Sequence, residues 1–198
     1  MAKLYFRYGA MNSGKSTALL QTAYNYEERG QRVLLAKPAI DTKGAERITS
    51  RLGVSRRVDL LLHADDDVRQ RVADAGAAAR IACLLVDEAQ FLTAAQVDDL
   101  LRIAVLDAIP VLAYGIRGDF RTHAFTGSAR LLELAHSLEE LKTICRCGRK
   151  AVFNARTVGG RVVFDGDQVA IDELDAEAVT YESMCAQCYL RESAGRLG

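Results

Sequence analysis

Eight residues near the start of the chain have the types and the spacing of a phosphate-binding loop. Residues 9–16 match the pattern G-x-x-x-x-G-K-[ST] in full. Glycines let the backbone curl so that successive N–H groups point at phosphate oxygens, and a following helix adds about half a positive charge at its N-terminus. The lysine would reach the β- and γ-phosphates, and the last serine hydroxyl would ligate Mg²⁺. The predicted phosphate-binding residues are Gly9, Ala10, Met11, Asn12, Ser13, Gly14, Lys15 and Ser16.

Two adjacent acids supply the carboxylates that such a loop needs beside its metal ion. Asp87 and Glu88 follow the apolar run 83–86, and the carboxyl end of a buried strand lies at the sheet edge where the loop opens. Asp87 is predicted to hold Mg²⁺, directly or through water. Glu88 is predicted to accept a proton from the nucleophile, which is water in an ATPase and a substrate hydroxyl in a kinase. The two acids alone leave both reactions open.

Four of the five cysteines form two close pairs in the last third of the chain. Four thiolates predict a closed tetrahedral Zn²⁺ site of the structural type, without an open position for catalysis. The tighter pair requires a turn, because alternate residues of a strand are ~6.7 Å apart and sulfurs on one zinc are ~3.8 Å apart. Reduced free thiols and a redox pair are the alternatives. The predicted ligands are Cys145, Cys147, Cys185 and Cys188.

Composition and charge exclude several other classes of protein. The chain has 198 residues, 49% hydrophobic and 26% charged, which suffices for one ordinary domain or a domain with a small appendage. Its 26 basic and 26 acidic residues cancel, which argues against binding dominated by nucleic-acid phosphates. No apolar run approaches the ~20 residues of a membrane helix, and the first residues are too polar for a signal peptide. We therefore expect a cytoplasmic protein that binds neither membrane nor nucleic acid and keeps its thiols reduced.

Apolar runs alternate with amphipathic stretches over the first 142 residues, which predicts an α/β fold with a parallel sheet. Strands are expected at 3–8, 32–37, 58–62, 81–86 and 110–114, and helices at 13–29, 65–75, from Thr93 with Gln96 in a capping box, and at 128–142. The polar segment 40–57 is expected to be a mobile loop. Strand-like pieces at 151–157 and 161–164 flank two glycines, a hairpin signal. The prediction is a P-loop (RecA-like) ATP-binding domain over 1–142 and a small zinc-binding β domain over 143–198.

Five segments in this order resemble the cytosolic, zinc-containing (type II) thymidine kinase family over nearly the full length. They are the phosphate-binding loop and residues 86–91, 114–121, 138–147 and 179–185. The resemblance implies transfer of the γ-phosphate of ATP to the 5′-hydroxyl of thymidine, giving dTMP and ADP. Glu88 matches the family's proton acceptor, and Ser16 and Asp87 match its Mg²⁺ side. The ATP-binding positions after the buried strand are Asp87, Glu88, Ala89 and Gln90.

The resemblance also implies where thymidine lies. In this family the segment between the cysteine pairs forms a lasso loop over the nucleoside, and its main chain hydrogen-bonds the base edge. Aromatic walls suit a flat, partly apolar pyrimidine. Lys43 and Arg51, in the polar loop, are candidates for neutralising the transferring phosphate. The positions that match the family's substrate contacts are Met11, Phe91, Ile116, Phe120, Phe125, Asn154, Val169, Ile171 and Tyr181.

Two other functions are compatible with the motifs themselves. One is a P-loop ATPase or switch module whose zinc knuckle binds nucleic acid or a protein partner. The other is a kinase for another nucleoside or a small alcohol. The family resemblance further implies pyrimidine deoxynucleoside salvage for DNA synthesis, a homotetramer, and feedback inhibition by thymidine triphosphate (dTTP).

Overall fold

The computed structural model describes residues 1–39, 46–164 and 179–198. In this part of the chain six strands form one sheet in the order β5-β2-β6-β7-β1-β8, and every pairing is parallel. This confirms the predicted α/β fold with a parallel sheet. The strands are β1 (Leu4–Tyr8), β2 (Val33–Pro38), β5 (Leu60–Leu62), β6 (Cys83–Val86), β7 (Val111–Gly115) and β8 (Ser137–Glu140).

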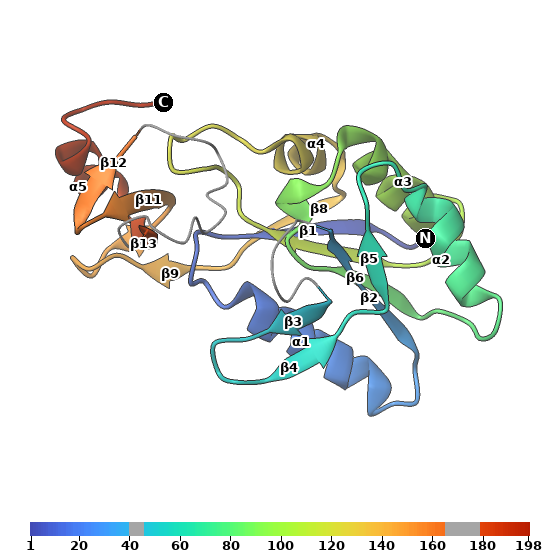
Figure 1. The fold of residues 1–198 in the computed structure, drawn as a ribbon. Helices are drawn as coiled ribbons and strands as arrows, with labels where there is room; N and C mark the ends of the chain where they lie inside the picture. The colour runs from blue at the N-terminus through green and yellow to red at the C-terminus, as the bar shows by residue number, and fades with distance from the viewer. Residues whose placement is uncertain (40–45, 165–178) are drawn as a thin grey trace.

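Helices cover both faces of this sheet (Figure 1), because strand side chains alternate between two apolar layers. In β6, Leu84 and Val86 belong to the layer that holds α2, α3 and α4, whereas Cys83 and Leu85 belong to the layer that holds α1. A strand buried on both faces has no polar alternation, which explains its continuous apolar run. The helices are α1 (Lys15–Glu27), α2 (Val68–Gly76), α3 (Ala94–Val105) and α4 (Thr126–Leu134), with the 3-10 helix η1 (Ala89–Phe91) after β6.

Strand β7 lies between β1, which leads into the phosphate-binding loop, and β6, which leads into the paired acids. Because all three strands are parallel, their carboxyl ends share one edge of the sheet, where ligands bind in open α/β folds. The segment that follows β7 therefore begins between the two phosphate-chemistry segments. The sheet brings together three stretches of chain that lie far apart in the sequence.

Local signals predicted several element ends correctly. The capping box is present: Thr93 Oγ1 accepts from the Gln96 N–H, and Gln96 Oε1 accepts from the Thr93 N–H. Gly30, with a φ of 69°, follows the end of α1 in the left-handed conformation expected of a helix-ending glycine. These contacts are local, so neighbouring residues suffice to specify them.

The predicted helix over 128–142 is wrong in its second half. Helix α4 ends at Leu134, and residues 137–140 form the edge strand β8 beside β1. The His136 N–H donates to the Leu4 carbonyl at 2.8 Å, and His136 Nδ1 accepts from the Leu4 N–H at 3.1 Å. Glutamate and leucine favour helix locally, but pairing with the open edge of β1 satisfies backbone groups that a longer helix would leave unpaired.

The predicted mobile loop over 40–57 is corrected for its described part. Strands β3 (Arg47–Thr49) and β4 (Ser55–Arg57) form an antiparallel hairpin. Ile48 is buried in the layer beneath α1, and Arg56 makes a two-pronged ion pair with Glu27 at 2.5 and 2.7 Å. Each strand has three residues, and Ile48 is the one apolar residue in either, which was too weak a signal to predict strands. Residues 40–45 lie outside the described residues.

The last part of the chain forms smaller sheets at one end of the molecule (Figure 1). The predicted hairpin is confirmed: β11 and β12 are antiparallel, and Gly159 and Gly160 both have positive φ, as a two-residue turn requires. None of the helices in the described ranges has the length and apolarity needed to cross a membrane. The elements are β9 (Thr143–Ile144), β10 (Lys150–Ala151), β11 (Phe153–Val158), β12 (Arg161–Val163), β13 (Val179–Met184) and α5 (Ala186–Glu192).

Candidate active site

The phosphate-binding loop joins β1 to α1 and is shaped by torsions that few residue types adopt. Asn12 and Gly14 have φ of 66° and 77°, left-handed torsions of the kind from which a nest of N–H groups is built. A Cβ on Gly9 would lie 2.4 Å from the Leu141 carbonyl oxygen, so only glycine fits there. Lys15 Nζ donates to a carbonyl of the loop itself at 2.9 Å, and burial lowers the pKa of this lysine.

Asp87 follows β6 and lies behind the serine that completes the loop motif. Ser16 Oγ donates to Asp87 Oδ2 at 3.3 Å, and Asp87 is only 4% exposed. Burial, followed by the neighbouring carboxylate of Glu88, raises the pKa of Asp87 from 3.8 to about 6. A hydroxyl and a carboxylate side by side are oxygen ligands of the kind that Mg²⁺ prefers.

We expect Asp87→Asn to stabilise the metal-free protein at neutral pH. The pKa of Asp87 is higher in the folded protein than its usual value, so the free energy of unfolding falls as the pH rises from about 4 through about 6. Above that range the free energy of unfolding of the variant should exceed that of the wild type by up to about 3 kcal/mol, because one pKa unit corresponds to about 1.36 kcal/mol. Urea unfolding of both proteins at about pH 4 and about pH 8 measures the difference.

A matched surface variant separates this effect from a general loss of acidic charge. Asp98→Asn removes a partly exposed ion pair with Arg130 and should change the unfolding free energy by less than about 1 kcal/mol. An Asp87→Asn protein that is equally stabilised at both pH values, or destabilised at the higher one, would contradict the burial argument.

Glu88 is oriented by an amide that bridges it to the end of β7. Gln90 Nε2 donates to Glu88 Oε2 at 2.5 Å, while Gln90 Oε1 accepts from the Ile116 N–H at 3.2 Å. A Cβ on Gly115 would lie 2.7 Å from Gln90 Oε1, so the bridge depends on glycine at this position. The carboxylate predicted to accept a proton is therefore fixed in place before any ligand binds.

A cavity of about 940 Å³ extends from the phosphate-binding loop to the segment after β7. Its volume lies at the upper end of the usual range for small-molecule sites. The lining includes most of the predicted residues: Met11, Asn12, Gly14, Lys15, Ser16, Glu88, Gln90, Phe91, Ile116, Phe120, Phe125, Asn154 and Tyr181. Five of the predicted ATP-binding residues do not line it: Gly9, Ala10, Ser13, Asp87 and Ala89.

Aromatic side chains form a further part of the cavity wall. Phe91 and Phe125 meet edge to face, with ring centroids 5.4 Å apart and planes at 79°. Phe120 is almost fully buried, and the guanidinium carbons of Arg121 and Arg156 lie 5.5 and 5.3 Å from its ring centroid. The wall is therefore held rigidly and suits a flat, partly apolar ligand.

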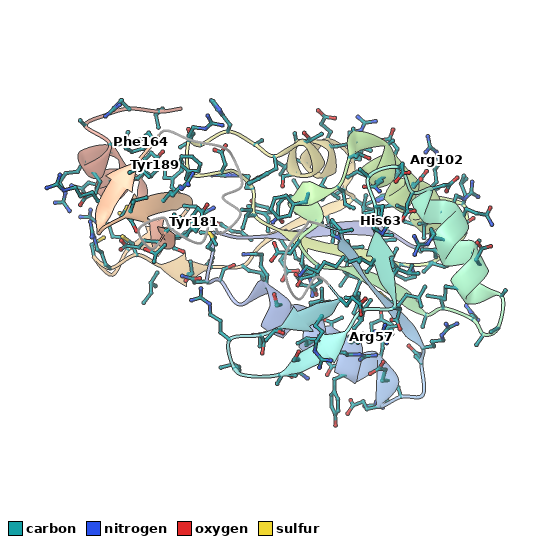
Figure 2. The ribbon with its side chains drawn as sticks, in the orientation of Figure 1. Arg57, His63, Arg102, Phe164, Tyr181 and Tyr189 are labelled. Atoms are coloured by element: carbon teal, nitrogen blue, oxygen red, sulfur yellow. The ribbon has the colours of Figure 1, made fainter. Side chains whose placement is uncertain are left out.

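The predicted lasso residues have different outcomes. Tyr181, labelled in Figure 2, lies on β13 and lines the cavity. Asn154 lines it too, but its side chain binds main-chain groups: Oδ1 accepts from the Met11 N–H at 2.7 Å, and Nδ2 donates to the Gly118 carbonyl at 3.0 Å. Val169 and Ile171, like Lys43, lie outside the described residues.

The sequence did not predict some of the residues that line the cavity. Lys37, at the end of β2, could have been found because the carboxyl ends of parallel strands face the ligand crevice. Residues 49–52 come from the β3–β4 hairpin, which no sequence signal predicted; they include Arg51, whose charge helps to lower the pKa of Lys15. Asp119 also lines the cavity and accepts two N–H groups of its own loop at 2.8 and 2.9 Å.

The four predicted metal ligands come together at the far end of the molecule. The sulfurs of Cys145, Cys147, Cys185 and Cys188 all lie within 4.8 Å of one another, and the Cys147–Cys185 pair is 3.5 Å apart. The turn required between the first two is present, because Gly148 has a φ of 82° and its N–H donates to the Cys145 carbonyl. This spacing fits a tetrahedral zinc site.

The surroundings of the cysteine cluster also fit a metal. The Cys188 N–H donates to Cys185 Sγ at 3.4 Å. This hydrogen bond favours the thiolate, which is the form that binds zinc. Arg191 Nη2 donates to Cys188 Sγ at 3.7 Å. Hydrogen bonds of this kind orient ligands and balance their charge.

A family model for thymidine kinase matches residues 2–189 of the chain. This range includes the phosphate-binding loop, the paired acids, the aromatic wall and both cysteine pairs. The chain belongs to the thymidine kinase family. The thymidine kinase of Mannheimia succiniciproducens is 46% identical over 199 residues, which cover 100% of this chain and 99% of the relative.

Other members of the thymidine kinase family match over a similar length. The thymidine kinase of Ruegeria pomeroyi is 46% identical over 200 residues, covering 100% of this chain and 98% of the relative. That of Chromobacterium violaceum is 48% identical over 191 residues, covering 96% and 98%. The family membership therefore applies to the whole site described above, from the phosphate-binding loop to the last cysteine.

Proposed function

We propose that this protein transfers the γ-phosphate of ATP to the 5′-hydroxyl of thymidine, giving dTMP and ADP. The observation that carries the proposal is one cavity whose lining combines Lys15 and Ser16 of the phosphate-binding loop, several aromatic side chains, and Glu88. A phosphoryl donor and a flat alcohol acceptor would meet at that carboxylate. Membership of the thymidine kinase family supports thymidine as the acceptor.

At the ATP end, catalysis rests on positioning and charge. The N–H groups of the phosphate-binding loop and the Lys15 ammonium would hold the β- and γ-phosphates. Ser16 and Asp87 would hold Mg²⁺, which would neutralise the negative charge that develops on the phosphates. Arg51, on the β3–β4 hairpin, also lines the cavity and would add a second cation beside Lys15.

At the acceptor end, Glu88 would take the proton of the 5′-hydroxyl as that oxygen attacks the γ-phosphorus and ADP leaves. Gln90 holds one carboxylate oxygen by a hydrogen bond and leaves the other to accept the proton. The base would lie against Phe91, Phe120 and Tyr181. Phe120 and Phe125 are buried and Phe91 and Tyr181 are half-buried, so a base packed against them would exclude water, which favours the sugar hydroxyl over hydrolysis.

The decisive experiment is ADP release from ATP and Mg²⁺ across a panel of nucleosides. We expect rapid release with thymidine, weaker release with deoxyuridine, and almost none without a nucleoside. Product identification as dTMP completes the test. Rapid hydrolysis without nucleoside would instead indicate an ATPase or switch module, and preference for another nucleoside would reassign the acceptor.

We further propose the division into domains at residue 142, a structural Zn²⁺ on the four cysteines, a cytoplasmic location, a homotetramer and inhibition by dTTP. The strand pairings support the division, because every strand of the six-stranded sheet precedes residue 142 and the three-stranded sheet lies beyond it.

Mass measurement in solution tests the proposed homotetramer, and competition of dTTP with the substrates tests the proposed inhibition.

A further inference from the structure

The main chain of Met11, at the third position of the phosphate-binding loop, is held on both its polar groups by the C-terminal sheet. Asn154 Oδ1 on β11 accepts from the Met11 N–H at 2.7 Å, and Ser183 Oγ on β13 donates to the Met11 carbonyl. A weaker contact at the next residue, from Thr143 Oγ1 to the Asn12 carbonyl at 3.4 Å, comes from the same side. These contacts join segments more than 130 residues apart in the chain.

The two contacts form a single unit of the three-stranded sheet. Asn154 and Ser183 are directly opposite each other in the antiparallel pairing of β11 with β13, so their side chains share one face. Asn154 is 4% and Ser183 6% exposed. Buried polar groups with partners on both sides fix geometry, because breaking either contact would leave a donor or an acceptor unpaired away from water.

The hydrogen bond to Met11 determines which N–H groups of the loop remain available to bind phosphate. Its N–H is committed to Asn154, so the cradle has to be made by the amides that follow, where Asn12 and Gly14 adopt left-handed torsions. Such torsions are costly for asparagine, and they persist only where the surroundings over-determine them. The pair from β11 and β13 supplies that constraint from outside the loop.

We propose that Ser183 and Asn154 are positioning residues that set the conformation of the phosphate-binding loop and so couple the zinc-bearing sheet to ATP binding. This rests on the proposed function only in taking the ligand of the loop to be a nucleotide. Tyr181, two residues before Ser183 on the same face of β13, lines the cavity. A ligand against Tyr181 and a nucleotide in the loop would therefore act on the same strand, and their binding would be linked reciprocally.

The test measures nucleotide binding without any nucleoside, so its result does not depend on which acceptor the enzyme uses. Calorimetric titration of the full-length protein with Mg·ADP should show Ser183→Ala weakened on the order of three- to ten-fold, the range expected for one lost hydrogen bond. Ser183→Thr keeps the hydroxyl and should restore wild-type affinity. Hydrogen exchange of the peptide covering residues 9–16 should be faster in Ser183→Ala than in the wild type.

Thr180→Ala is the matched control on the same strand. The Thr180 hydroxyl pairs with Thr157 at 2.6 Å across β11 and β13 and has no contact with the phosphate-binding loop among the described residues. Its loss should leave ADP affinity unchanged. Zinc content, measured for every variant, should stay at the wild-type value. The proposal is overturned if Ser183→Ala binds Mg·ADP as tightly as the wild type, if Thr180→Ala is weakened equally, or if Ser183→Thr fails to restore the affinity.

Discussion

Glu88→Gln is expected to slow phosphate transfer to thymidine by about 10²–10⁴-fold, the usual contribution of a general base. Glutamine has the same shape, and its side-chain oxygen can still accept the hydrogen bond that Gln90 Nε2 donates. It cannot take the proton of the 5′-hydroxyl. Steady-state kinetics with saturating thymidine measures the rate, and titration with Mg·ADP should show that nucleotide affinity changes little.

A second carboxylate provides the control for this substitution. Glu46 is exposed and pairs with Arg57, which Figure 2 labels on the hairpin side of the molecule, so Glu46→Gln should leave rate and affinity unchanged. The assignment of Glu88 fails if Glu88→Gln keeps more than about a tenth of the wild-type rate.

Removal of zinc is expected to disorder the C-terminal sheet and abolish nucleoside binding. Three of the four cysteines are among the seven fully buried side chains of the small apolar cluster there, which leaves little core without the metal. A structural zinc contributes on the order of 10 kcal/mol to such an element. Cys185→Ser should therefore lose zinc, protection from hydrogen exchange over 143–164 and 179–198, and thymidine binding.

The fifth cysteine separates metal binding from loss of a thiol in general. Cys83 is buried in β6 within the main sheet, far from the other four in the fold. Burial raises its pKa to about 12, so it stays a neutral thiol. Cys83→Ala should keep one zinc per chain and thymidine binding. Equal zinc content in wild type and Cys185→Ser would exclude the four-cysteine site.

Much of the fold and of the site follows from patterns that act over short distances. The G-x-x-x-x-G-K-S motif, the capping box at Thr93 and the Gly159-Gly160 turn each specify a conformation through neighbouring residues. The apolar run before Asp87 predicted a strand buried on both faces, and hence the edge at which both acids lie. The spacing of the four cysteines predicted their meeting point.

The features that were not predicted depend on distant partners. Strand β8 exists because the edge of β1 needs a neighbour, although its residues favour helix when taken alone. The β3–β4 hairpin is anchored through Ile48 and through the ion pair of Arg56 with α1, and neither contact has a local signature. The two hydrogen bonds to the Met11 main chain join positions 11, 154 and 183, and no sequence periodicity relates these positions.

The place of β7 between β1 and β6 has a consequence for how acceptor preference could be altered. The residues for phosphate chemistry follow β1 and β6, whereas Phe120 and Phe125, the two buried rings of the aromatic wall, follow β7. A lineage built on this sheet can therefore evolve toward a different alcohol through substitutions within 117–125 that keep Gly118, whose carbonyl binds Asn154, while the donor-binding residues stay unchanged. Ile116 should stay unchanged, because its N–H donates to the side-chain amide of Gln90, which orients Glu88. Libraries aimed at modified nucleosides would begin one residue later.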